Sequence, residues 1–255
     1  MGLNMHADSP QESPQPTAKK PSWLKSGAEA QEELAAEEQK QQAETEQRGK
    51  MWRFWLKPEE SGVHITFVDG ALIEDGPQKG MLDAMIYREH TVRMGANDWR
   101  NFVCVSEEGP CPICDSGNKY ATVQVFTVID HREFTVKNGP NAGKTYKDRP
   151  KLFVAKAGTR RKLQKAATKR GGIAGWTCEV GRTDGKTARV GDEFEWEGQV
   201  PDLVTAFGEQ AVVADYATEL PYFPAEELAK MGLGPVTGTI GAGFGDLPAD
   251  DEIPF

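Results

Sequence analysis

Three cysteines in one short stretch carry the clearest chemistry in this sequence. Cys111 and Cys114 form a Cys-Pro-Ile-Cys pair with two residues between the thiols, and six residues separate Cys104 from Cys111. The two-residue spacing lets both thiolates point at one cation, and Pro112 stiffens the turn between them. The pattern therefore predicts a structural Zn²⁺ site.

A structural zinc site needs a fourth ligand. His90 is the preferred candidate because it closes the segment "YREH" shortly before the cysteines, and His64 and His131 are the alternatives. Cys178 lies in the apolar segment "WTCEV" and is expected to be a small buried residue. A redox-active pair and free thiols without a role are the other interpretations. The glycine, proline and aspartate around the pair favour zinc over redox chemistry.

The segments around these residues predict a mainly β fold. Short alternating stretches such as "YATVQVFTVID" are separated by turn signals, including Asn138-Gly139 and Asp184-Gly185. Residues 158–170 are expected to form a helix that "GG" at 171–172 ends. We expect an OB-fold-like antiparallel barrel, closed or nearly closed, with this inserted helix and a zinc knuckle. Flexible acidic segments are expected at both ends of the chain.

Three domains follow from composition. Residues 1–50 are expected to be a disordered or helical acidic arm, with helix-favouring Glu, Gln and Ala at 26–49. Residues 51–220 are expected to form the zinc-containing domain, in which "VTAFGEQAVVADYATELPYF" adds one or two strands. Residues 221–255 are expected to hold a short helix at 224–232, a Gly-rich linker and an acidic tail.

The charge distribution favours a polyanionic ligand. The net charge is −9, but residues 51–200 carry 23 basic and 20 acidic residues, and residues 201–255 carry one basic and ten acidic residues. Within 144–170, eleven lysines and arginines stand against Asp148 alone. A basic stretch of this kind indicates a nucleic-acid binder, although a solvated helix face is the plainer interpretation of part of it.

The candidate ligands for single-stranded nucleic acid are basic groups for phosphates and aromatic rings for bases. The phosphate candidates are Lys144, Lys147, Arg149, Lys151, Lys156, Arg160, Arg161, Lys162, Lys165, Lys169 and Arg170. The stacking candidates are Trp52, Trp55, Trp99, Tyr120, Tyr146 and Phe153, of which Trp99 and Tyr146 stand out because polar residues flank them. Each of these rings is more often a core residue than a stacking platform.

The sequence gives no sign of a catalytic centre or of a membrane span. The one run of three adjacent carboxylates is in the tail, at 250–252. A nuclease or primase fragment would need a cluster of carboxylates for metal ions, so a non-enzymatic protein is expected. "NGPNAGKTY" at 138–146 departs from a P-loop, since only three residues separate Gly139 from Gly143 and a strand follows. No apolar run nears the roughly 18–20 residues of a membrane span, and no secretory signal opens the chain, so a cytoplasmic location is expected.

The chain closes with Asp250, Asp251 and Glu252, followed by Ile253, Pro254 and Phe255. Three carboxylates before an apolar tip indicate a segment that another molecule binds, with Phe255 in an apolar pocket and the acids on a basic rim. The same tail could also fold back on the basic groove and compete with nucleic acid.

Several of these pieces resemble one family. "HITFVDG", "YREH", "WRNFVC", "CPIC" and "FTVID", in this order, are similar to segments of bacteriophage-encoded single-stranded-DNA-binding proteins, over roughly 50–200. "DDEIPF" is similar to the acidic C-terminus of bacterial single-stranded-DNA-binding proteins. The resemblance implies an OB-fold core, a channel for single-stranded DNA, and a tail that recruits replication, recombination and repair enzymes in the host cytoplasm. The arm at 26–49 departs from the family, and a zinc-ribbon adaptor that binds a polymerase is the alternative function.

Overall fold

The computed structural model describes residues 26–35, 51–57, 60, 62–95, 98–137, 141–182 and 189–235. The chain divides into two compact units, Met1–Lys50 and Met51–Phe255. In the first unit, residues 28–35 form a helix whose side chains are almost all exposed, Leu34 included. This confirms a solvated helix for part of the predicted arm. Within the described residues, no helix has the length and apolar character needed to cross a bilayer.

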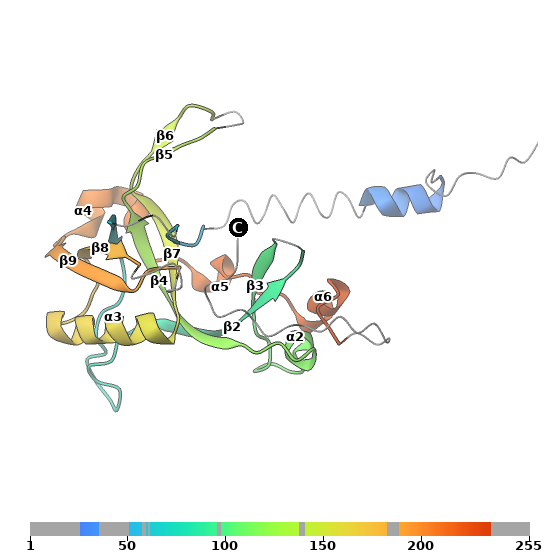
Figure 1. Cartoon of the computed structure of the whole chain (residues 1–255), viewed down its shortest axis with the longest axis horizontal. Coiled ribbons are helices and arrows are strands. Elements are labelled where there is room, and N and C mark those ends of the chain that lie inside the picture. Colours follow the sequence, from blue (N-terminus) through green and yellow to red (C-terminus); the bar gives the residue numbers. More distant parts are fainter. Residues whose placement is uncertain are drawn as a thin grey trace, which may run out of the picture. The chain divides into compact units, whose positions relative to one another are not determined.

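The second unit is built on antiparallel strands (Figure 1). The seven strands of the main sheet are β1 (Val63–Phe67), β2 (Met85–Arg93), β3 (Trp99–Val103), β4 (Ala121–Asp130), β7 (Arg149–Ala155), β8 (Trp176–Gly181) and β9 (Glu193–Gln199). A separate two-stranded hairpin consists of β5 (Phe134–Thr135) and β6 (Thr145–Tyr146). The mainly β prediction is therefore confirmed. Asn138-Gly139 and Asp184-Gly185 lie outside the described residues, but the strands flanking each of them pair as hairpins.

Strand β4 is the centre of the sheet. One edge pairs with β2 through residues 121–125 and with β1 through 128–130, while the other edge pairs with β7 through 124–130. Its apolar residues alternate between two faces, as its period-two pattern predicts. Phe126 and Val128 enter the main core, whereas Val123 and Val125 join a second apolar cluster on the opposite face.

The prediction of a closed barrel is wrong. The main path of the sheet runs β3-β2-β4-β1-β8-β9, with β7 branching from β4, and the described parts of β7 and β9 do not pair. Residues 52–54 lie along β7 instead: the Phe54 N–H donates to the Leu152 carbonyl at 2.8 Å, and the Leu152 N–H donates to the Trp52 carbonyl at 3.0 Å. Farther along, the Leu56 N–H donates to the carbonyl of Arg189, which precedes β9, at 2.7 Å. The N-terminal segment thus takes the hydrogen bonds that a closing strand would have made.

The inserted helix is α3 (Ala157–Arg170), close to the predicted 158–170. Leu163, Ala166 and Ala167 form its buried side and pack in the main core with Phe67 and Phe153. The helix ends at Gly171, whose φ of 75° is the left-handed cap conformation that glycine adopts readily. The double glycine at 171–172 therefore stops the helix as predicted.

The chain after β9 forms short helices where one or two strands were expected, so that prediction is wrong. They are α4 (Leu203–Phe207), η1 (Gly208–Ala211) and α5 (Tyr216–Glu219). The Asp202 carboxylate accepts from the Thr205 N–H, and the Asp215 carboxylate accepts from the Ala217 N–H. These side chains cap the first turns and favour helix locally. Tyr216 then packs with Val123 and Val125, so the segment covers the second face of the sheet.

Two short helices complete the unit, α2 (Pro112–Asp115) and α6 (Ala225–Lys230). The second confirms the helix predicted at 224–232. Both belong to a third apolar cluster, which also contains Val92 of β2 and Phe102 of β3.

Candidate functional sites

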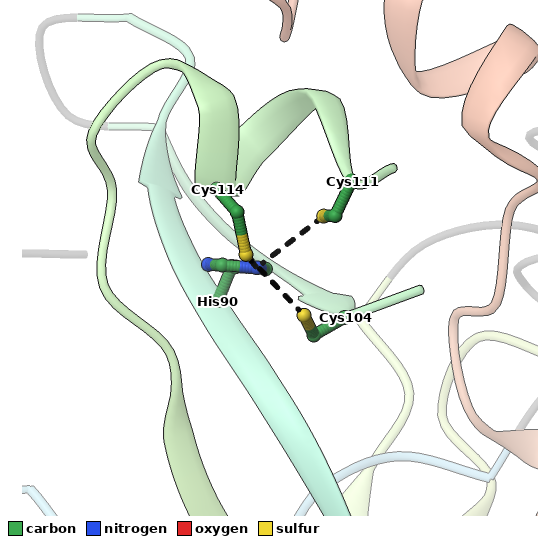
Figure 2. A group of neighbouring side chains, drawn as sticks. All are labelled: His90, Cys104, Cys111 and Cys114. Carbon is green, nitrogen blue, oxygen red and sulfur yellow. Dashed lines mark hydrogen bonds between the residues drawn. The ribbon is translucent and has the colours of Figure 1, made fainter. Parts of the chain in front are cut away.

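The three cysteines and His90 come together in one cluster (Figure 2). The His90 Nε2 lies 3.4 Å from the Cys114 Sγ and 3.6 Å from the Cys111 Sγ, and the sulfurs of Cys104 and Cys114 are 3.6 Å apart. All four potential ligand atoms lie within 4.8 Å of one another. His90, Cys104 and Cys111 are buried and Cys114 is half-buried. The group could hold a metal ion, and three sulfurs with one imidazole nitrogen match a four-coordinate soft-ligand site.

Three elements place these side chains. The antiparallel register pairs His90 of β2 with Phe102 of β3, and Cys104, two residues farther on, returns to the same face of the ladder. The Cys104 N–H donates to the Arg88 carbonyl at 2.8 Å, which extends the pairing to this cysteine. Cys111 caps the start of α2 and Cys114 lies one turn later, so both sulfurs face the strands.

The protonation states of His90 and Cys114 bear on how the cluster could hold a cation. Burial lowers the pKa of His90, which keeps the ring neutral, and its Nδ1 lies 3.1 Å from the Asn118 Oδ1. This contact turns Nε2 towards the sulfurs, as an outer partner of a ligating histidine does. Burial and the neighbouring sulfurs of Cys104 and Cys111 raise the pKa of Cys114 to about 12. A metal ion binds the thiolate form of cysteine, so loading the cluster would release thiol protons.

The alternative histidines lie elsewhere. The His131 Nε2 contacts the Thr66 hydroxyl at 2.8 Å, and its Nδ1 faces Asp148. The His64 Nε2 is 2.7 Å from Glu197, and these two residues form a second, exposed group with Glu179. The His64–Glu197 contact accounts for two members of that group without a metal. Among the described histidines, only His90 reaches the cysteines. Cys178 is fully buried in the main core, as predicted.

The predicted basic stretch 144–170 is divided between the two ends of β7 (Figure 1). Lys144, Tyr146 and Lys147 are exposed on the hairpin before β7, whereas α3 follows β7. A seven-residue strand separates the two groups by about 20 Å. On α3, the exposed cations are Arg161, Lys162, Lys165 and Lys169, while Lys156, Arg160 and Arg170 are half-buried.

Two of the α3 cations already have protein partners. The Lys162 Nζ lies 2.9 Å from an Asp192 carboxylate oxygen. The Arg170 guanidinium lies over the rings of Trp176 and Trp196, at 5.3 and 4.7 Å from their centroids. The helix therefore presents only part of its charge outwards, and the candidates from 144–170 do not form a single surface.

The aromatic residues predicted to stack on bases differ in how exposed their rings are. Phe153 has no exposed surface, so it has no face to offer a base, and its assignment as a ligand is wrong. Trp55 and Trp99 are half-buried, and the Arg93 guanidinium lies 5.8 Å from the Trp99 ring. Tyr120 is exposed beneath Arg88, near the metal cluster. Trp52 is the most exposed ring of all the described aromatics, at 66%.

The structure adds Phe134, which sequence reasoning missed. Phe134 pairs directly with Tyr146 across the β5–β6 hairpin, and the two rings are 44% and 41% exposed. The Arg149 guanidinium lies 4.4 Å from the Phe134 centroid. The alternating segment "REFTVKNG" before the turn carries the only sequence signal, since it places Phe134 on a hairpin arm.

Trp52 extends this group along β7. The Leu152 N–H donates to the Trp52 carbonyl at 3.0 Å, which holds the exposed indole beside the strand. The Lys151 Nζ lies 5.8 Å from the indole centroid. Burial, and after it the charge of Arg149, lowers the pKa of Lys151 to about 8. We call Trp52, Phe134, Tyr146 and Arg149, together with the largely buried Lys151, the hairpin–β7 surface.

The predicted tail residues 250–255 lie outside the described residues. Comparison with known proteins adds no relative: neither a protein-family model nor a curated protein matches this chain.

Proposed function

We propose that this chain is a non-enzymatic protein that binds single-stranded DNA without sequence preference and serves phage replication, recombination and repair. The proposal is based on the exposed aromatic rings and the neighbouring cations of the hairpin–β7 surface. Large apolar rings in a monomeric protein are normally buried, so a group of exposed rings with cations stacked on or beside them needs an explanation. Unpaired bases would cover the exposed faces of these rings, and their phosphates would pair with the cations beside them.

The chemistry of the surface suits unpaired DNA more than duplex DNA. Bases stack on aromatic rings with about 1–3 kcal/mol each, and every base has a face to offer, which makes such binding tolerant of sequence. In a duplex these faces are already stacked on one another. Phe134 and Tyr146 supply two platforms on the hairpin, and Trp52 supplies a third beside β7. Arg149, Lys144 and Lys147 supply charge for the backbone.

We propose that the His90–Cys104–Cys111–Cys114 cluster binds structural Zn²⁺ as a zinc knuckle. When bound, the ion cross-links two strands and a short helix, and thiolate and imidazole ligands fill its four positions. We propose an OB-fold-like architecture for the rest of the unit, in which antiparallel strands pack around the main apolar core, even though the barrel is open. The C-terminal residues 250–255 are proposed to recruit partner enzymes through their charge and their apolar tip.

A competition experiment tests the proposed function. The full chain is mixed with one labelled oligo(dT), and unlabelled competitors of equal length are added: oligo(dC), a mixed single strand and a duplex. We expect both single strands to compete at similar concentrations and the duplex to compete poorly. Strong preference for one sequence, or equal competition by the duplex, would contradict the proposal. Binding to a polymerase with no binding to any DNA would favour the adaptor function.

A further inference from the structure

Residues 221–234, which include α6, pack against the His90–Cys104–Cys111–Cys114 cluster. We call this segment the C-terminal clasp. Leu228 has no exposed surface and Leu233 only 8%, and both pack in the same cluster as Ile113 and the metal-site residues Cys104 and Cys111. The clasp is more than 100 residues away from these cysteines in the sequence.

Further contacts tie the clasp to each part of the metal module. The Val103 N–H at the end of β3 donates to the Pro221 carbonyl at 3.3 Å. Phe223 packs on Phe102 with 5.9 Å between centroids. At the far end, Gly234 lies beside α2, where an added Cβ would be 3.7 Å from the Pro112 side chain. The clasp therefore spans the module from β3 to α2.

The elements that carry the cysteines have little stability of their own. α2 has four residues, far fewer than the roughly 12–15 that an isolated helix needs to be even marginally stable in water. Residues 105–110 form no strand or helix, and one backbone hydrogen bond, from the Cys104 N–H to the Arg88 carbonyl, ties Cys104 to β2. Apolar packing by Leu228 and Leu233 on one side, and ligation on the other, must together hold these residues in place.

We propose that metal binding and packing of the C-terminal clasp form one coupled equilibrium. Each lowers the conformational cost of the other, and such coupling is reciprocal by thermodynamic linkage. Leu228 is accordingly a positioning residue for the metal ligands, although it touches no ion. The inference rests on the proposed metal site and does not depend on DNA binding.

Two matched variants of the full chain test the coupling. Leu228→Ala and Leu163→Ala each remove a fully buried leucine from a helix, the first in the clasp and the second in α3 of the main core. Zinc affinity is measured by competition with a chromophoric chelator. We expect Leu228→Ala to bind Zn²⁺ about 10–100-fold more weakly, as is typical when support behind metal ligands is lost. We expect the affinity of Leu163→Ala to equal that of the wild type. Unchanged affinity in Leu228→Ala, or an equal loss in both variants, would overturn the proposal.

The reciprocal measurement needs no variant. Amide hydrogen exchange of the wild-type protein is followed with Zn²⁺ and after chelation. We expect removal of the ion to speed exchange at residues 225–233 while β7 and α3 stay protected. Exchange in the clasp that is indifferent to zinc would contradict the coupling even if Leu228→Ala failed to fold. An oligo(dT) titration of the same samples separates this result from the proposed function, because the hairpin–β7 surface has no residue in the clasp.

Discussion

The Arg149 guanidinium lies 4.4 Å from the centroid of the Phe134 ring, and Phe134 is the cross-strand partner of Tyr146. These residues come from both arms of one hairpin and from the strand that follows it. A cation stacked against an exposed ring holds that ring's orientation and leaves its other face open. The hairpin therefore presents two rings and a fixed charge as one preformed unit, which lowers the entropic cost of binding a flexible strand.

Removing both rings tests this unit. We expect Phe134→Ala combined with Tyr146→Ala to weaken oligo(dT) binding by at least tenfold, because each stacked base contributes about 1–3 kcal/mol. Fluorescence anisotropy of a labelled oligonucleotide measures the change. Val204→Ala, which truncates an exposed apolar residue of α4, is the control and should bind as the wild type does. Equal affinity in the double variant would remove the hairpin from the binding surface.

The lowered pKa of Lys151 leads us to expect that DNA binding depends on pH. Its pKa is lowered to about 8, chiefly by burial, and a phosphate bound beside Trp52 would favour the charged form. Affinity should therefore be highest below pH 8 and should fall as the pH rises through 8 and the free protein loses this proton. Binding isotherms at pH 7 and pH 9 at constant ionic strength measure the effect. The arginine of the Lys151→Arg variant keeps its charge across this range, so this control should bind oligo(dT) equally at both pH values. If the wild-type affinity did not change with pH, the proposed role of Lys151 would be contradicted.

The sequence pattern predicted the His90–Cys104–Cys111–Cys114 cluster better than it predicted where the basic and aromatic candidates lie. The three cysteines of the cluster lie within eleven residues of one another, at 104–114, so local chain geometry alone nearly brings their sulfurs together. His90 reaches them because β2 pairs with β3. The residues of 144–170 are also close in sequence, but a strand and a helix direct their side chains to different ends and sides. Trp52 and Phe134 join Arg149 and Lys151 only through long-range packing, which spacing alone does not reveal.

The same distinction applies to the fold. The period-two alternation of apolar residues predicted the strands, and the double glycine that begins at Gly171 predicted the end of α3. Closure of the barrel depended on which segment pairs with the free edge of β7, and residues 52–54 occupy it. Helices α4 and α5 arose where Asp202 and Asp215 cap turns in an apolar stretch that otherwise resembles a strand. Whether such a segment becomes a helix or a strand depends on competition between local helix caps and tertiary strand pairing. The alternation of apolar residues in the sequence does not reveal which of the two wins.

Loss of His90 should release the metal. We expect the wild type to retain about one Zn²⁺ per chain and His90→Ala to retain much less after dialysis, since a three-ligand thiolate set lacks the fourth donor of a structural site. Metal analysis of both proteins provides the measurement. His64→Ala is the matched control, because His64 lies with Glu179 and Glu197 instead, and it should keep its zinc. Equal zinc in wild type and His90→Ala would show that the cluster is not the metal site.

The hydroxyl of Tyr216 should stabilise the fold from the second face of the sheet. It donates to the Asp69 carboxylate and lies 2.9 Å from the Thr127 hydroxyl, all in a largely buried setting. Tyr216→Phe should lower the free energy of unfolding by about 1–3 kcal/mol, because it leaves a buried carboxylate short of a donor. Urea denaturation measures the loss. Tyr222→Phe removes a hydroxyl that contacts Glu108 at an exposed position and should cost far less; equal losses would contradict the importance of the buried network.

The central claim is that the folded unit binds single-stranded DNA through cations and exposed rings. A titration of the full chain with oligo(dT), followed by tryptophan fluorescence at low and at high salt, tests it most directly, because the indole of Trp52 is 66% exposed on the proposed surface. We expect quenching at low salt, with an affinity whose logarithm falls as the logarithm of salt concentration rises, by about 0.7 for each phosphate neutralised. No quenching and no binding of oligo(dT) in dilute buffer would contradict the account.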